Sequence, residues 1–151
     1  MSSRVRAEFE PRISLVTLGV ADVERSARFY EGLGFRRSRG SSVESTVFIP
    51  LRGIVLGLYG RSALAEDAGM SDGVAGSFGG ITLAYNARDR DEVETLFARA
   101  VETGARALRT PRETAWGGYS GYVADPDGHP WEIAFNPHWA LSEDGALRLP
   151  A

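Results

Sequence analysis

The 151-residue sequence contains no cysteine, which excludes disulfides, thiolate metal sites and a cysteine nucleophile. It also lacks a basic stripe, because arginine and acidic residues are interleaved and the net charge is -3. Neither this pattern nor any base-stacking motif points to nucleic acid. No hydrophobic run approaches the length that spans a membrane, and the N-terminus lacks the apolar core of a signal peptide. We therefore expect a cytoplasmic protein with no nucleic-acid or membrane partner.

What the sequence does contain is typical of a folded protein. Hydrophobic residues make up 43% and charged residues 25% of the chain, as in ordinary globular domains. A chain of this length can bury a sizeable core. We expect a single domain over residues 1–151, or two small half-domains that share a sheet.

The stretch from Trp116 to Asn136 is the one around which we expect the chain to be organised. Two strand-like runs flank Asp-Pro-Asp-Gly at 125–128. Proline presets φ, aspartates bond nearby amides and glycine tolerates positive φ, so the runs should fold back as a hairpin. Because side chains alternate along a strand, Glu132 and Ala134 share one face, which should line solvent or a cavity. The opposite face, which should pack on a helix, consists of Trp131, Ile133 and Phe135.

The first half predicts a βαβββ module over residues 13–59. Strand-forming residues fill 13–20, Asp22 is a good N-cap, and apolar residues then recur at helical spacing as far as a pair of glycines. The three further strands are expected at 35–39, 43–51 and 54–59. Residues 60–79, rich in glycine, alanine and serine, predict a linker with a short helix at 63–68.

The second half repeats this order over residues 80–136. A strand is expected at 81–85, and an apolar helical stripe from Val93 to Val101 is closed by Gly104. Three more strands are expected at 106–108, 119–124 and 131–135. The tail, 137–151, should lie over the domain or over a partner subunit. The sequence thus predicts an α+β fold of two tandem βαβββ modules.

Two sets of residues, at their mutual spacing, carry a family resemblance. The first module contributes Val20-Ala21-Asp22, Ser26, Phe29-Tyr30 and Leu33-Gly34-Phe35. The second contributes Asp125-Pro126-Asp127-Gly128 and Glu132. Residues 13–136 thereby resemble the vicinal oxygen chelate superfamily, which includes glyoxalases, bleomycin-resistance proteins and extradiol dioxygenases. The resemblance implies a curved, half-barrel mixed sheet around a cavity, often completed by a second subunit, with a divalent metal bound by one residue from each of four strands.

The metal positions that the resemblance implies fall on Leu15, Gly57 (Leu56 after a one-residue shift), Gly80 and Glu132. Only Glu132 can bind a metal, whereas a catalytic metal takes about three protein ligands. The two histidines, His129 in the turn and His138 beyond the last strand, match no family ligand position. We therefore expect no cofactor, and a divalent metal held through other residues is the alternative.

Glu132 is the candidate catalytic residue. In an apolar cavity a lone carboxylate loses hydration, so its pKa should rise, and it can then accept a proton or anchor a ligand. The alternative is a structural carboxylate paired with an arginine, for which Arg52 and Arg109 are available. The candidate ligand-binding residues, for which sheet packing is the alternative role, are Thr17, Tyr59, Thr82, Trp116, Tyr119, Tyr122 and Asn136.

The leading hypothesis is a metal-independent homodimer that binds a small aromatic or peptide-like molecule. The main rival is an enzyme, either a glyoxalase-like lyase or isomerase or a dioxygenase-like oxidoreductase, with Glu132 as base or metal ligand. A weaker rival is a regulatory or scaffold dimer with a vestigial pocket. Fold alone does not decide among them.

Overall fold

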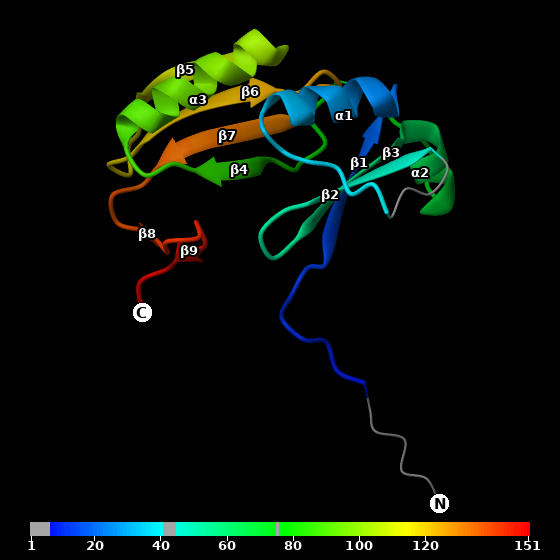
Figure 1. Cartoon of the computed structure of the whole chain (residues 1–151), viewed down its shortest axis with the longest axis horizontal. Helices are drawn as coiled ribbons and strands as arrows, with labels where there is room; N and C mark the ends of the chain where they lie inside the picture. Colours follow the sequence, from blue (N-terminus) through cyan, green and yellow to red (C-terminus); the bar gives the residue numbers. More distant parts are fainter. Residues whose placement is uncertain (1–6, 41–44, 75) are drawn as a thin grey trace, which may run out of the picture.

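Two sheets carry the fold in a computed structural model that describes residues 7–40, 45–74 and 76–151 (Figure 1). The first sheet has the strand order β1-β3-β2, with β1 parallel and β2 antiparallel to β3. Its elements are β1 (Leu15–Val20), α1 (Val23–Gly32), β2 (Thr46–Pro50) and β3 (Val55–Gly60), followed by α2 (Arg61–Asp67).

The second sheet has the order β4-β7-β6-β5, with β4 parallel to β7 and the other pairs antiparallel. Its elements are β4 (Leu83–Asn86), α3 (Arg90–Thr103), β5 (Arg106–Glu113), β6 (Tyr119–Ala124) and β7 (Pro130–Phe135). The tail forms a small two-stranded sheet of β8 (Ala140–Leu141) and β9 (Leu147–Arg148). The α+β class, with two repeated modules, is confirmed. No helix in the described part of the chain is long and apolar enough to cross a bilayer.

Both longer helices begin at an aspartate. The Asp22 side chain accepts a hydrogen bond from the Arg25 amide at 3.0 Å, and the Asp89 side chain accepts one from the Glu92 amide at 2.7 Å. Each bond satisfies an amide that has no partner inside the helix. The N-cap predicted at Asp22 and the end of the second helix at Gly104 are both confirmed.

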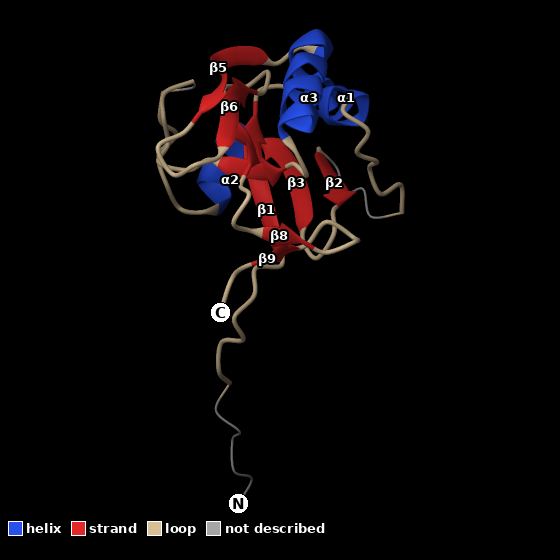
Figure 2. Ribbon diagram, turned by 90° about the vertical axis from the view of Figure 1, so that its left-hand side faces the viewer, coloured by secondary structure: helices blue, strands red, loops and turns tan. Residues whose placement is uncertain are grey.

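The two helices lie next to each other on one side of the sheets (Figure 2). α1 packs on β2 and β3, and α3 packs on β5, β6 and β7. Beneath them the buried side chains of both modules form one continuous core, which includes Leu58 of the first sheet and Ile133 of the second. Gly121 fits closely here, since an added Cβ would lie 3.0 Å from the Phe97 ring and from the β5 backbone. This packing leaves the opposite face of the second sheet without a helix.

The prediction of a strand at 35–39 is wrong. After α1 the chain is irregular, and the Phe35 ring stacks parallel to Tyr30 with 6.1 Å between ring centroids. Core docking of this aromatic residue therefore overrides its strand propensity. The first module is consequently βαββ.

Other boundaries shift by a few residues. The strand expected at 81–85 begins at Leu83, the one at 106–108 extends to Glu113, and the short linker helix begins at Arg61. Of the strand expected at 43–51, positions 43 and 44 lie outside the described residues, and the remainder is β2.

The tail is fastened to both modules. The Arg88 guanidinium donates to the carbonyls of Ser142 and Glu143, each at 3.1 Å. Arg52, in the β2–β3 turn, donates to the Asp144 carbonyl. Arg52 therefore anchors the tail and is not the counter-charge of Glu132.

Candidate functional site

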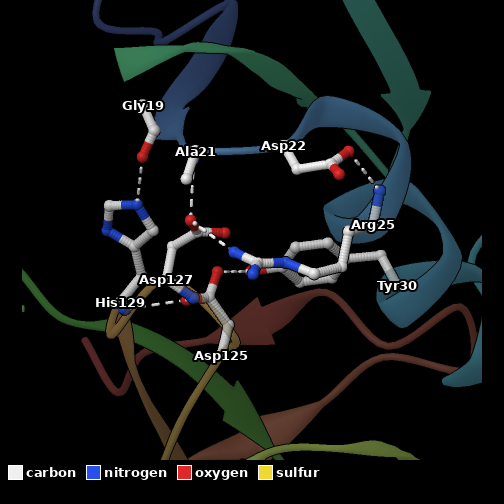
Figure 3. Close-up of polar contacts among 8 residues, drawn as sticks. All are labelled: Gly19, Ala21, Asp22, Arg25, Tyr30, Asp125, Asp127 and His129. Carbon is white, nitrogen blue, oxygen red and sulfur yellow. Dashed lines mark hydrogen bonds and ion pairs between the residues drawn. The ribbon is translucent and has the colours of Figure 1, made fainter. Parts of the chain in front are cut away.

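The Asp-Pro-Asp-Gly turn between β6 and β7 is anchored to α1 through Asp125 (Figure 3). This carboxylate is 3% exposed and accepts hydrogen bonds from the Tyr30 hydroxyl at 2.7 Å and from the amides of Asp127 and His129 at 3.0 and 2.8 Å. The Trp131 indole donates to the Tyr30 oxygen at 3.0 Å. Burial, and then the neighbouring Asp125 charge, raise the pKa of Tyr30 well above its ordinary value. The hydroxyl is therefore held protonated as a donor to Asp125.

Asp127 and His129 connect the same turn to the end of β1. Asp127 Oδ1 accepts a hydrogen bond from the Ala21 amide at 2.8 Å and from Arg25 at 3.1 Å. The His129 ring Nε2 lies 2.8 Å from the Gly19 carbonyl oxygen (Figure 3). The two sets of motif residues found in the sequence thus meet in one network that fastens the second module to the first. These contacts join the end of β1 and the start of α1 to the β6–β7 turn.

Glu132 lies elsewhere, on the face of β4–β7 that α3 leaves uncovered, which we call the open face of the second sheet. Its Oε2 accepts a hydrogen bond from the Tyr122 hydroxyl at 3.1 Å, directly across the β6–β7 pair. Burial, and then the hydrogen bond to Glu132, raise the pKa of Tyr122. Both side chains are half-buried and reach solvent. Two of the candidate residues from the sequence, Glu132 and Tyr122, are thus brought together in the structure.

Small side chains surround this pair. Ala84 of β4 lies directly beside Glu132 and is exposed, and Ser120 and Ala134 occupy the next register position along β6 and β7. The carboxylate and the phenol ring are therefore the largest groups on this part of the open face. Ser120 and Ala134 are only 5% and 4% exposed, so the part of this surface that reaches solvent consists of Ala84, Glu132 and Tyr122.

One end of the open face carries an aromatic ring. The Trp116 ring lies over Gly118, where an added Cβ would come within 1.8 Å of the ring and 2.5 Å of the Phe135 carbonyl oxygen. Gly118 lies on the same side of the chain as Ser120 and Tyr122 by strand alternation. Trp116 is 45% exposed, so part of its ring remains available to a ligand.

Three arginines line the β5 edge of the open face. Arg106, Arg109 and Arg112 are spaced three apart, which would place them on alternating faces of a regular strand. Register shifts between 107 and 109 and between 109 and 112 instead pair them with Ala124, Tyr122 and Ser120. All three arginines therefore share the face of Glu132, and all three are exposed. The sequence analysis found Arg109 alone, because the shifts cannot be read from alternation.

The remaining predicted ligand residues lie apart from this pair. Tyr119 is on the helix side of β6, where its hydroxyl donates to Glu94 of α3 and the Arg90 guanidinium lies 5.2 Å from its ring centroid. Asn136 follows β7 and accepts a hydrogen bond from the His138 amide at 2.9 Å. Thr82 precedes β4 and is exposed.

Thr17 and Tyr59 belong to the first sheet. By register they share the face of that sheet that is opposite to the core residues of β1 and β3. Thr17 also lines a cavity of about 350 Å³ between β1, the linker and the Asp-Pro-Asp-Gly turn. Glu132 does not line this cavity. The predicted ligand residues are thus divided between two locations.

The residues at the implied metal positions do not fit a metal. There is little space for a side chain at Gly57. A Cβ placed there would lie 3.0 Å from the Thr17 hydroxyl and 3.4 Å from the Phe48 ring. Leu15 is apolar, and Gly80 precedes β4 instead of lying in it. Within the described ranges, no group of three or more histidine, cysteine, aspartate and glutamate side chains could hold an ion. Beside Glu132 the neighbouring oxygen is that of the Tyr122 phenol, and one carboxylate falls short of the about three protein ligands that a catalytic metal takes.

Comparisons with known proteins agree with this fold. The chain is 40% identical to a glyoxalase-related enzyme from Fulvimarina pelagi, over 94% of this chain and 100% of that one, with a TM-score of 0.83. A lactoylglutathione lyase from Agrobacterium tumefaciens is 20% identical over 88% of this chain and 99% of that one (TM-score 0.64), which shows similarity of fold alone. A glyoxalase/bleomycin resistance protein/dioxygenase family enzyme from Burkholderia phytofirmans PsJN is also similar, with 20% identity, coverage of 82% and 98%, and a TM-score of 0.71.

A comparison with curated proteins found no match. The sequence model of the Glyoxalase/Bleomycin resistance protein/Dioxygenase superfamily matches residues 12–133, which include both modules and end just after Glu132. Together with the fold, this match shows that the chain belongs to the Glyoxalase/Bleomycin resistance protein/Dioxygenase superfamily.

Proposed function

We propose that the protein binds a small aromatic molecule on the open face of the second sheet, without a metal. The observation that carries this proposal is the hydrogen-bonded pair of Tyr122 and Glu132, which is accessible to solvent and flanked by small side chains. The phenol offers a ring for stacking, and the carboxylate offers an acceptor. Trp116 supplies a second exposed ring on the same face.

Glu132 can serve as the polar anchor of such a ligand. Its Oε2 is occupied by Tyr122, and Oε1 has no hydrogen bond to any residue that the structure describes. A ligand hydroxyl or N–H group can therefore donate to Oε1 while its ring lies against Tyr122. A charge-assisted bond of this kind is stronger than one between neutral groups.

An enzyme is the second candidate, and the same pair favours it. Glu132 could accept a proton from a bound substrate at Oε1, which has no hydrogen bond to a described residue. The similarity to the glyoxalase-related enzyme from Fulvimarina pelagi supports this alternative. Completion of a metal site by His129 is not supported, since the ring of this histidine faces the Gly19 carbonyl.

A homodimer that covers exposed apolar side chains is part of the proposal. Ile13 and Leu15 at the start of β1, and Phe78 and Ile81 before β4, are between 44% and 74% exposed. Large apolar groups gathered at an exposed site are typical of protein–protein contacts. Light scattering on the purified protein should give twice the chain mass, and Ile81→Asp should shift it to the chain mass.

Two measurements test the metal-independent binding function. Elemental analysis after expression in metal-supplemented medium should find far less than one equivalent of metal. Stoichiometric metal that is lost in Glu132→Ala would overturn the metal-independent proposal.

The second measurement follows N-phenyl-2-naphthylamine, a neutral fluorescent aromatic amine, in the presence of a chelator. Ala84→Trp fills the open face beside Glu132, so it should abolish binding of this probe. Ala98→Trp, at an exposed position on α3, is the matched control and should leave binding unchanged. Binding that survives Ala84→Trp would place the ligand elsewhere and contradict the proposal.

A further inference from the structure

The arginines of β5 give the open face a positive charge. The three-residue spacing of these arginines in the sequence does not predict that they share a face. Arg106, Arg109 and Arg112 stand opposite three successive same-face residues of β6, so they form one row along the edge. None of them forms an ion pair with an acidic residue in the described ranges. A row of three free guanidinium groups is notable in a protein whose net charge is -3.

The acidic side chains nearby do not neutralise this row. Glu113, at the end of β5, shares the helix side with Tyr119 and pairs with Arg90 at 2.8 Å. Glu132 accepts from Tyr122, whose hydroxyl lies between the glutamate and Arg109 in strand order. The Arg109 charge is close enough to Tyr122 to act on its pKa, where it opposes the increase caused by burial and Glu132.

The three groups lie in a line across the sheet. Arg109, Tyr122 and Glu132 are register partners on β5, β6 and β7. Adjacent strands are about 4.8 Å apart, so the backbone positions of Arg109 and Glu132 are separated by about 10 Å across β6. That span matches a molecule of one or two fused rings with a substituent at each end.

We propose that the open face recognises a planar aromatic anion, whose acidic group binds the β5 arginines while its ring lies on Tyr122 and a hydrogen-bond donor at its other end faces Glu132. This inference rests on the proposed binding function and adds the charge and the orientation of the ligand. Arginine suits this role because its planar fork binds carboxylate, sulfonate or phosphate oxygens in pairs. The line of groups also disfavours a dianion with acids at both ends, since one end would face Glu132.

Two fluorescent probes that differ in one group test the inference. 2-Anilinonaphthalene-6-sulfonate carries the rings and N–H of N-phenyl-2-naphthylamine together with a sulfonate at the opposite end of the naphthalene. The double variant Arg109→Gln/Arg112→Gln should weaken binding of the sulfonate probe by about tenfold, from a few-fold per exposed ion pair. Binding of the neutral probe should stay within twofold. Added salt should likewise weaken the sulfonate probe selectively.

The matched control is Arg28→Gln/Arg148→Gln, which removes two exposed arginines outside the second sheet. It should leave the affinity of both probes unchanged. Equal affinity of the sulfonate probe for wild type and Arg109→Gln/Arg112→Gln would overturn anion recognition, and the binding function would stand if Ala84→Trp still blocks both probes. If Ala84→Trp blocks neither probe, both the inference and the proposed function fail.

Discussion

The Asp125 network and the open face around Glu132 are two polar regions of one hairpin, and they differ in how far their groups are satisfied. Asp125 is buried and spends both carboxylate oxygens on hydrogen bonds to Tyr30 and to two turn amides. Glu132 is half-buried, holds a single bond to Tyr122 and leaves one oxygen to solvent. Asp125 has no oxygen left to offer a ligand, whereas Glu132 has one. In the same network Asp127 is the exception, since its buried Oδ2 has no hydrogen-bond partner among the described residues.

This difference separates family membership from function. Of the residues that carry the family motif, Asp22, Tyr30 and Asp125 cap a helix or join the two modules, whereas Glu132 lies on the open face. The first three are compatible with any chemistry that the fold supports. The specific character of this chain lies in groups outside the motif, such as Tyr122 and the arginines of β5.

The largest effect should come from Asp125→Ala. It strands the Tyr30 hydroxyl and two amides in a buried site, so we expect a loss of about 3 kcal/mol or more in the free energy of unfolding. Urea denaturation measures this loss. Asp67→Ala removes an exposed carboxylate at the end of α2 and should change stability little. A tolerated Asp125→Ala would mean that the turn is held by other contacts.

Tyr30→Phe should have the next largest effect. It removes the donor to Asp125 and the acceptor of Trp131, for an expected loss of about 1–3 kcal/mol near neutral pH. Tyr59→Phe is the control. The Tyr59 hydroxyl has no hydrogen bond to a described residue, so its removal should change the free energy of unfolding little.

The pH dependence of Tyr30→Phe has a definite sign. Because folding raises the pKa of Tyr30, the folded state holds this proton more tightly than the unfolded chain. Its contribution is therefore complete below about pH 10 and is lost as pH rises through the folded-state pKa. The stability difference between wild type and Tyr30→Phe should shrink above about pH 10. A difference that stays constant there would show that the hydroxyl is not protected by folding.

The smallest effect on stability should come from Glu132→Gln. The Glu132 carboxylate is half-buried and accepts one hydrogen bond, which a glutamine can accept as well. Replacing it should therefore change the free energy of unfolding by about 0.5 kcal/mol or less. The pKa of Tyr122 should fall, because the acceptor loses its charge, and ultraviolet titration detects this change. Glu102→Gln, on the exposed side of α3, should leave the pKa of Tyr122 unchanged. A large loss of stability in Glu132→Gln would assign this residue to the scaffold.

Local rules predicted much of this structure. Turn chemistry gave the hairpin at 125–128, and helical periodicity gave α3. Alternation along β7 correctly separated Glu132 from the apolar face that packs into the core. Alternation would also have separated Tyr119 from Tyr122, which are three residues apart on β6 and therefore face opposite sides.

The features that the sequence did not predict depend on contacts between distant segments. Phe35 leaves its expected strand because it packs between Tyr30 and Trp131. Arg106 and Arg112 join the open face because β5 twice shifts its register against β6. The residues next to Phe35 in the sequence do not reveal its aromatic partners. Those next to Arg106 and Arg112 likewise do not reveal the register shifts of β5.

The most direct test of the contrast between the two regions is a crystal structure grown with Mn²⁺ and 2-anilinonaphthalene-6-sulfonate, inspected at Glu132 in an anomalous difference map. We expect no manganese peak there, with ring density against Tyr122 and the sulfonate at Arg109 or Arg112. A manganese ion coordinated by Glu132 and further protein ligands, with the rings bound elsewhere, would contradict the account.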